Sequence, residues 1–331
     1  MNRKQIVARI ETDAPLCCAA SWDNSGIQVR GTREEISCLA IALDPSPETI
    51  FRALEHGADF ILTHHPLGLT PRFPNKDDDY RRILNMLMRS GAWLYAAHTT
   101  LDSQPDGPPA WLARALGLQN TQVLETTGKK TSLLIRIHSQ TAPEIIRHPK
   151  IINPTKYGDT HEFVVWQHEW PGVRQDLQAL FGLDFSWQAI TLHEPSRSLG
   201  FGCIGDLSHP TDWPGFTSRL SALLGKKYWT RIGSPPEQIS RIAYCPGSGA
   251  SLAQTAFDRG AQIYITGDIK YHQALEVENT GLTLDVGHHV LEEKMIQVWY
   301  EKLQQDFRSH DIECIFLPGH DPLCIEPGGI Q

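Results

Sequence analysis

Three kinds of feature are scarce in this 331-residue sequence, and each scarcity argues against a class of protein. The seven cysteines are scattered and form no Cys-x-x-Cys pair, which predicts reduced thiols in a cytoplasmic protein rather than a disulfide framework. No stretch approaches the roughly 18 apolar residues of a membrane helix, and no basic region followed by an apolar run opens the chain. We therefore expect a cytoplasmic protein with no membrane partner.

Dense runs of lysine and arginine are also missing. The 30 basic and 38 acidic residues give a formal net charge of −8, and no basic stretch could follow a phosphate backbone. The sequence thus argues against nucleic acid as a primary partner and favours a small-molecule substrate. A hydrophobic content of 40% is enough to bury the core of one large domain or two ordinary ones.

The most informative feature that is present is an internal repeat. Residues 53–65 and 256–268 share a helix end, a glycine, an apolar strand and a polar strand exit. In each copy a second strand then starts at a glycine and reaches a histidine, with a carboxylate four residues later. These positions are Gly91, His98 and Asp102 in the first copy and Gly281, His288 and Glu292 in the second. The duplication predicts one metal centre shared by two pseudo-symmetric halves.

The apolar patterning predicts an α/β fold built from a duplicated βαβ parent domain. In the first half we expect strands at 39–43, 60–63 and 93–97 and helices at 47–56 and 80–89. In the second half we expect strands at 239–244, 263–266 and 282–286 and helices at 250–259 and 271–278. A closing helix is indicated by apolar residues that step by four along one face: Leu291, Met295, Trp299, Leu303 and Phe307.

Between the two halves the pattern changes to that of a small α+β domain. The expected elements there are strands at 131–138, 162–166 and 185–192 and a helix at 173–181. Because the two copies of the repeat flank this segment, we interpret residues 129–195 as an inserted domain. Residues 1–128 and 196–331 are then the two halves of a discontinuous parent domain.

Histidine and carboxylate residues gather at the expected strand ends. His64 and His65 follow four apolar residues, at the carboxyl end of a strand, where open α/β sheets bind their ligands. His288 and Glu292 stand at i and i+4 at the opening of the last helix, so both lie on one helix face. Asp102 provides an opposing carboxylate. Three imidazoles and two carboxylates suit two divalent ions bridged by a carboxylate.

We assign the bridge to Glu292, because its side chain is longer than that of Asp102 and suits metals ~3.5–4 Å apart. Since the set contains no cysteine, a hard or borderline metal such as Zn, Mn or Fe is favoured. Alternatively, these residues serve as helix caps and ordinary polar loop residues.

Other polar residues border the expected centre. His98 matches His288 in the repeat and could be a ligand, but we favour a place behind the ligands, hydrogen-bonded to Asp102 or to a metal-bound water. Asp268 could act as a general base or orient a ligand histidine. We therefore predict catalytic roles for Glu292, Asp268 and His98.

Two short motifs leave alternatives open. The segment 22–24, Trp-Asp-Asn, could hold a substrate or a water over the metals, or form a capping turn with a packing tryptophan. The glycines of the segment 246–249, Pro-Gly-Ser-Gly, could cradle an anion on free backbone N–H groups or could allow tight strand-to-helix packing.

Taken together, these motifs resemble the NIF-three-like family, whose members are often labelled GTP cyclohydrolase I type 2 homologues. The resemblance is carried, in the family's order, by residues 21–29, 43–44, 63–67, 98–102, 247–251, 265–272 and 287–292. It implies a two-metal site whose ligands fall on His64, His65, Asp102, His288 and Glu292. It also implies toroidal homohexamers in which the metals face an internal cavity.

The expected activity is hydrolysis. Two metals would share a water whose pKa falls towards neutrality, which supplies a bridging hydroxide as the nucleophile. The family label implies GTP as the substrate, with attack at C8 of the purine ring. The rival interpretation is a non-catalytic scaffold that stores or delivers metal or binds a partner.

Overall fold

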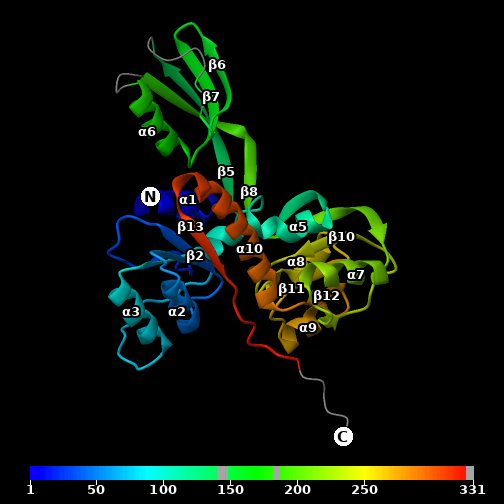
Figure 1. Ribbon diagram of the computed structural model, residues 1–331. Coiled ribbons are helices and arrows are strands. Elements are labelled where there is room, and N and C mark those ends of the chain that lie inside the picture. The colour runs from blue at the N-terminus through cyan, green and yellow to red at the C-terminus, as the bar shows by residue number, and fades with distance from the viewer. Residues whose placement is uncertain (140–145, 147, 182–185, 326–331) are drawn as a thin grey trace. The chain divides into compact units, whose positions relative to one another are not determined.

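The computed structural model describes residues 1–139, 146, 148–181 and 186–325 (Figure 1). It divides the chain into two compact units, Met1–Glu125 with Gly200–Gln331, and Thr126–Leu199. We call the first the parent unit and the second the insert unit. The strands that connect them, β5 (Gln119–His138) and β8 (Ser186–Thr211), continue past residues 129 and 195. Polar residues such as Glu125, Lys129 and Lys130 interrupt the apolar pattern of β5, so its full length has no local signal.

The first sheet of the parent unit has the order β1-β4-β3-β2-β13. Its strands are β1 (Gly26–Val29), β2 (Cys38–Ala42), β3 (Phe60–Thr63), β4 (Trp93–Ala96) and β13 (Glu313–Leu317). The last four strands are parallel, and β1 pairs antiparallel with β4 at the edge. The three strands predicted in the first half are therefore neighbours, whereas β1 and β13 were not predicted.

The second sheet repeats four strands of this arrangement. Within the parent unit its order is β8-β10-β11-β12-β9, with strands β9 (Thr230–Ile232), β10 (Ile239–Tyr244), β11 (Ile263–Thr266) and β12 (Leu282–Asp285). Strands β10, β11 and β12 are parallel, and β9 pairs antiparallel with β12 as β1 does with β4. The fifth strand, β8, pairs antiparallel with β10. The predicted α/β class is confirmed, and the duplicated strands occupy equivalent places in two sheets.

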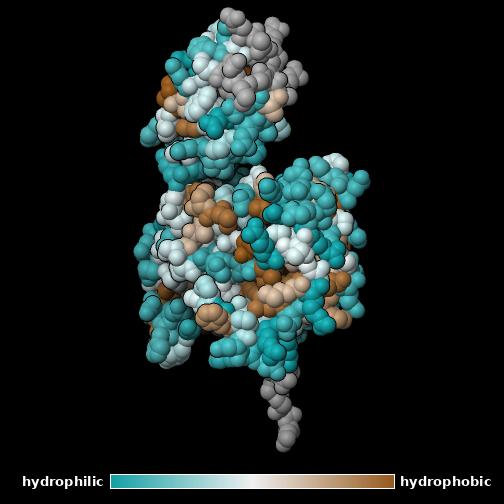
Figure 2. Space-filling view, turned by 90° about the vertical axis from the view of Figure 1, so that its left-hand side faces the viewer, coloured by the Kyte–Doolittle hydropathy of each residue, from teal (hydrophilic) through white to brown (hydrophobic). Residues whose placement is uncertain are grey.

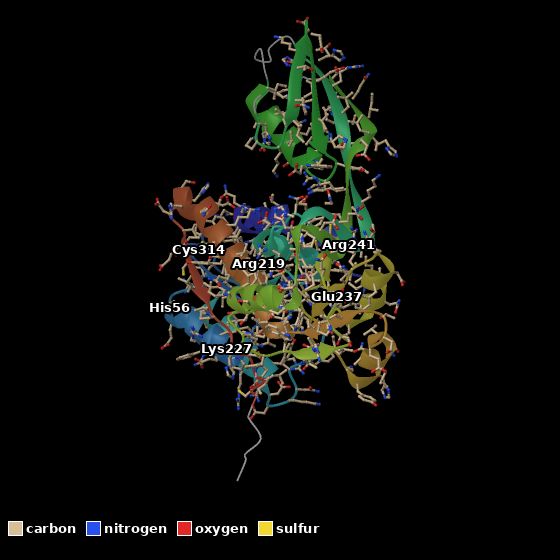
Figure 3. All side chains as sticks on the ribbon, turned by 90° about the vertical axis from the view of Figure 1, so that its right-hand side faces the viewer. His56, Arg219, Lys227, Glu237, Arg241 and Cys314 are labelled. Carbon is tan, nitrogen blue, oxygen red and sulfur yellow. The ribbon has the colours of Figure 1, made fainter. Side chains whose placement is uncertain are left out.

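The helices of the parent unit are α1 (Arg3–Asp13), α2 (Pro47–Glu55), α3 (Asp79–Ser90), α4 (Thr99–Asp102), α5 (Trp111–Leu116), α7 (Trp213–Leu224), α8 (Ala253–Asp258), α9 (Tyr271–Val277) and α10 (His288–Phe307). Short 3₁₀ turns are η1 (Leu16–Cys18), η2 (Pro108–Ala110), η3 (Ala250–Leu252) and η4 (Arg308–His310). The helix expected at 250–259 is thus η3 followed by α8. Helices α1, α5 and α7 were not predicted. Arg219 of α7, labelled in Figure 3, donates a hydrogen bond to the carbonyl of Ala115 in α5.

The closing helix α10 packs between the two sheets (Figure 1). Its predicted apolar stripe is buried, and one core cluster joins Met295 and Trp299 to Ile41 of the first sheet and Ile265 of the second. The neighbouring Ala40 of β2 belongs to a different cluster, with residues of α2 and α3. Because side chains alternate along a strand, α2 and α10 lie on opposite faces of the first sheet.

In the insert unit, β5 pairs antiparallel with β7 (Thr160–Trp166), which pairs with β6 (Ile152–Tyr157). Helix α6 (Trp170–Phe181) packs on one face through Val173 and Leu177. Of the strand expected at 185–192, Phe185 lies outside the described residues, and the rest belongs to β8. Among the described residues, no helix is long and apolar enough to cross a membrane, and hydrophilic residues cover much of the face seen in Figure 2.

A candidate metal centre between the two sheets

The histidines and carboxylates singled out in the sequence meet at the carboxyl ends of the strands. His64 and His65 follow β3, and their backbone N–H groups continue the strand pairing by donating to Ala42 and Leu43. His98 precedes α4, whose last residue is Asp102. In the other half, His288 opens α10 and Glu292 lies one turn later.

Glu292 is the central side chain, and its two oxygens face different histidines. Its Oε2 lies 2.7 Å from Nε2 of His288 and 3.0 Å from Nε2 of His65. Its Oε1 lies 3.7 Å from Nε2 of His64, which is also 3.6 Å from Oδ1 of Asp102. Two groups of side chains could therefore hold a metal ion: His65, His288 and Glu292, and His64, His65 and His98.

All four histidines share one orientation. In each ring Nδ1 is hydrogen-bonded to an oxygen that can only accept, which fixes one proton on Nδ1 and leaves Nε2 as the nitrogen available to a metal ion. The pairs are His64 with the Ala97 carbonyl at 2.9 Å, His65 with Asp44 at 2.7 Å, His98 with Asp23 at 2.8 Å, and His288 with Asp268 at 2.6 Å. This is the arrangement of histidines that bind metal through Nε2.

Two of these supporting carboxylates, Asp44 and Asp23, were not predicted to hold a histidine. Asp44 follows β2 as His65 follows β3, and its place at a neighbouring strand end is the signal that could have identified it. Asp23 contacts His98, which was expected to bond Asp102 or a water. Asp23 also accepts hydrogen bonds from the hydroxyls of Ser25 and Thr99. The segment 22–24 therefore holds His98 in place beside the centre.

Asp268 holds His288 from a strained backbone position. Its φ of 59° lies in the left-handed region, which costs a non-glycine residue about 1–2 kcal/mol. Such strain persists where surrounding contacts enforce it, often at functional sites. Of the two predicted roles for Asp268, the hydrogen bond to Nδ1 of His288 supports the orienting one.

The donor atoms fit a metal ion because their present contacts are with one another. Nε2 of His64 and Oδ1 of Asp102 are buried without a hydrogen bond and lie 3.6 Å apart, and Nε2 of His288 faces Oε2 of Glu292 at 2.7 Å. Each unpaired buried polar atom costs about 1–3 kcal/mol. A divalent cation would engage all four, and nitrogen and carboxylate oxygen are ligands that Zn, Mn and Fe accept.

The glycines of the 246–249 motif allow the second sheet to approach Glu292. Gly247 has a φ of +67°, and a Cβ added there would lie 2.1 Å from Oε1 of Glu292. The N–H of Gly249 donates to Oγ1 of Thr266 at 2.9 Å. These contacts support the packing interpretation of the motif over the anion cradle.

Without metal, the centre holds protons. Burial disfavours the charged form of His65, but hydrogen bonds to Asp44 and Glu292 outweigh it and raise the pKa of His65 to about 10. Burial is likewise outweighed at His288, whose pKa is raised to about 9 by Glu292 and Asp268. The pKa of Glu292 is lowered despite its burial, because protonated histidines surround it.

Metal uptake is therefore expected to release protons. At pH 7 both His65 and His288 are protonated in the metal-free protein, and both must lose the Nε2 proton to bind a metal. At least two protons should leave per loaded subunit, and affinity should rise with pH until about pH 9–10. Titration calorimetry in two buffers of different ionisation enthalpy measures this number. Uptake with no proton release, or affinity independent of pH between 6 and 8, would contradict the arrangement.

Substitution of the supporting carboxylates should weaken metal binding without removing a ligand. We expect Asp268→Asn and Asp44→Asn each to lower metal affinity about 10- to 100-fold, because an amide can present its NH₂ group to Nδ1 and disturb the ring. Competition with a chelator of known affinity measures the effect. Asp77→Asn, at an exposed side chain, is the control and should bind metal normally.

Comparison with known proteins agrees with this picture. A family model described as Duf34/NIF3 (NGG1p interacting factor 3) matches residues 1–322. The chain belongs to this family. The resemblance drawn from the sequence motifs is thereby confirmed.

Relatives in the Duf34/NIF3 family are distant but cover the whole chain. A Staphylococcus aureus (strain MRSA252) protein named GTP cyclohydrolase 1 type 2 homolog is 24% identical, over 94% of this chain and 98% of its own. The crystal structure of a Bacillus cereus protein related to NIF3 superposes with a TM-score of 0.83 at 24% identity, covering 98% of this chain and 99% of that one. A Staphylococcus aureus crystal structure gives 0.73 at 22% identity, with the same coverage. These likenesses establish the fold.

Proposed function

We propose that this Duf34/NIF3 protein is a metal-dependent hydrolase with a dinuclear divalent-metal centre and a small-molecule substrate. The observation that carries the proposal is the convergence of four histidines and two carboxylates, of which Nε2 of His64 and Oδ1 of Asp102 have no hydrogen bond. His64, Asp102 and Glu292 would hold one ion, and His65, His288 and Glu292 the other, so that Glu292 would bridge them. The names of the curated relatives support a nucleotide as the substrate.

Zn, Mn or Fe, when bound, would lower the pKa of a shared water and act as Lewis acids towards the substrate. The protein's own residues hold the ligand rings in place and transfer protons. His98, held at Nδ1 by the buried Asp23, can accept or give a proton at Nε2 beside the centre. Asp44 and Asp268 keep the rings of His65 and His288 aimed at the ions. Trp22 packs edge-on to His98 at 5.7 Å and limits its rotation.

The remaining features of the proposal come from the family resemblance and the residue composition. We infer a homohexamer in a cytoplasmic location, with the segment 129–195 as an inserted domain. Light scattering of the purified protein tests the subunit number. A trimer or monomer at micromolar concentration would exclude the hexamer.

Elemental analysis combined with a hydrolysis screen tests the function. The purified protein should contain about two metal equivalents per subunit and should hydrolyse at least one member of a nucleotide panel when Mn or Zn is added. Chelation should remove both metal and activity. Two equivalents of metal with no turnover on the panel would favour the alternative function, a non-catalytic scaffold or metal-delivery protein.

A further inference from the structure

A cavity lies at the carboxyl ends of β2 and β13 in the first sheet, beside the metal centre. The sheet reverses its winding between β2 and β13, because α2 and α3 cover one face and α10, which precedes β13, covers the other. In open α/β sheets, ligands bind outside the carboxyl ends of the strands at such a reversal. A cavity of ≈ 760 Å³ opens at this place, between Asp44 and Ser46 after β2 and Pro318 and His320 after β13.

The size and walls of this cavity suit an organic molecule. Its volume lies within the ~300–1,000 Å³ of small-molecule sites. Pro45, Pro47, Leu67 and Pro322 give it largely apolar walls. A ligand binds to such walls because its apolar surface and theirs are removed from water. The few polar groups between the walls then set the orientation of the ligand.

One wall presents an arginine with several fixed contacts. The guanidinium carbon of Arg72 lies 4.1 Å from the centre of the Tyr80 ring, and the same guanidinium bonds Asp78 at 3.1 Å. The Tyr80 hydroxyl donates to the backbone carbonyl of Arg72 at 3.2 Å, which ties the two residues together. A guanidinium is itself planar, and one held by a ring and a carboxylate can stack against a planar ligand.

The polar groups of the lining favour a ligand that donates hydrogen bonds. Three carboxylates line the cavity, those of Asp44, Glu48 and Asp79. The two arginines already have acceptors, since Arg72 bonds Asp78 and Arg52 donates to the Pro318 carbonyl at 3.2 Å. The start of α2 is capped by Ser46, whose hydroxyl accepts from the N–H of Thr49. An anion would thus meet acidic groups and occupied cations.

We propose that this cavity binds a neutral planar heterocycle that carries N–H and O–H donors, as a nucleoside does. The ring stacks against Arg72, and its donors reach the carboxylates of Asp44 and Glu48. This binding rests on the cavity and not on the proposed hydrolysis. Because Oδ1 of Asp44 also bonds Nδ1 of His65, the ligand is one side chain away from the metal centre.

Titration calorimetry on the full chain tests the proposal, with guanosine and adenosine as probes and GMP and inorganic phosphate for comparison. We expect at least one nucleoside to bind, in metal-loaded and metal-free protein alike, and more tightly than GMP or phosphate. Arg72→Ala and Arg72→Lys should both weaken it about tenfold, because lysine keeps the charge but not the plane. Glu48→Gln should also weaken it. Arg89→Ala, near the end of α3 and outside the cavity, should bind normally.

Three results would overturn the proposal: no nucleoside binding at millimolar concentration, unchanged binding in Arg72→Ala, or tighter binding of phosphate or GMP than of any nucleoside. Thermal unfolding and metal content, measured on every variant, identify a folding defect. Should Arg72→Ala fail to fold, Arg72→Lys and Glu48→Gln carry the test. Because the metal-free protein is included, failure here leaves the metal centre and its activity untouched, and the reverse also holds.

Discussion

Replacing Glu292 with glutamine is expected to remove metal from the centre and, with it, turnover. The two carboxylate oxygens face different histidines, so the amide would place an NH₂ group against a ring nitrogen that needs a cation. Substitution of a residue that only supports a ligand costs about 10- to 100-fold in affinity, and the loss here should exceed that. We expect less than one metal equivalent at micromolar free metal, by elemental analysis.

Glu301→Gln is the matched control for this variant. Glu301 lies on the same helix, with an exposed side chain, so the substitution changes the charge of α10 equally without touching the centre. It should keep full metal content and full activity. A Glu292→Gln protein that retains two equivalents and hydrolyses at the normal rate would end the proposal that Glu292 bridges two ions.

Replacing Gly247, which follows β10 of the second sheet, with alanine should disrupt the same metal centre. The new Cβ would lie 2.1 Å from Oε1 of Glu292, closer than any contact allows, so the carboxylate must move. The φ of +67° adds about 1–2 kcal/mol of backbone strain. We therefore expect both lower stability in denaturant titrations and loss of metal affinity, the latter by more than about 100-fold if Glu292 is displaced.

A glycine elsewhere in the chain separates the two effects. Gly260 has a similar φ of +81°, but the nearest atom to an added Cβ is 3.8 Å away. Gly260→Ala should therefore lose a similar 1–2 kcal/mol of stability and keep its metal. Equal metal affinity in the two variants would show that Glu292 adjusts to the added methyl group.

The internal repeat could be predicted from the sequence because the residues that mark it are close together in the chain. Gly57 and Gly260 each follow a helix in the left-handed conformation, with φ of 78° and 81°, and apolar strands of four residues follow each one. Both features depend on neighbouring residues only, so the sequence of each copy predicts the same helix, turn and strand. The α/β class and the strand ends that carry His64, His65 and His288 followed from them.

Elements without such local signals were missed. Strand β13 lies beside β2 through pairs such as Ile315 with Ala40, which no local pattern indicates. Since β13 creates the reversal of the first sheet, the cavity beside Asp44 could not be predicted either. The full extent of β5 and β8, which run from the parent unit into the insert unit without a break, has no local signal either.

The sequence by itself determined which residue types would meet at the strand ends, since periodicity and the repeat set the elements and their direction. Only the tertiary structure decided how those side chains are held. The hydrogen bond between His98 and Asp23 joins residues 75 positions apart, and the one between His65 and Asp44 spans 21. Packing of two sheets around α10 creates these contacts, because it brings one acceptor to each Nδ1 and places Nε2 of His64, His65 and His288 near Glu292.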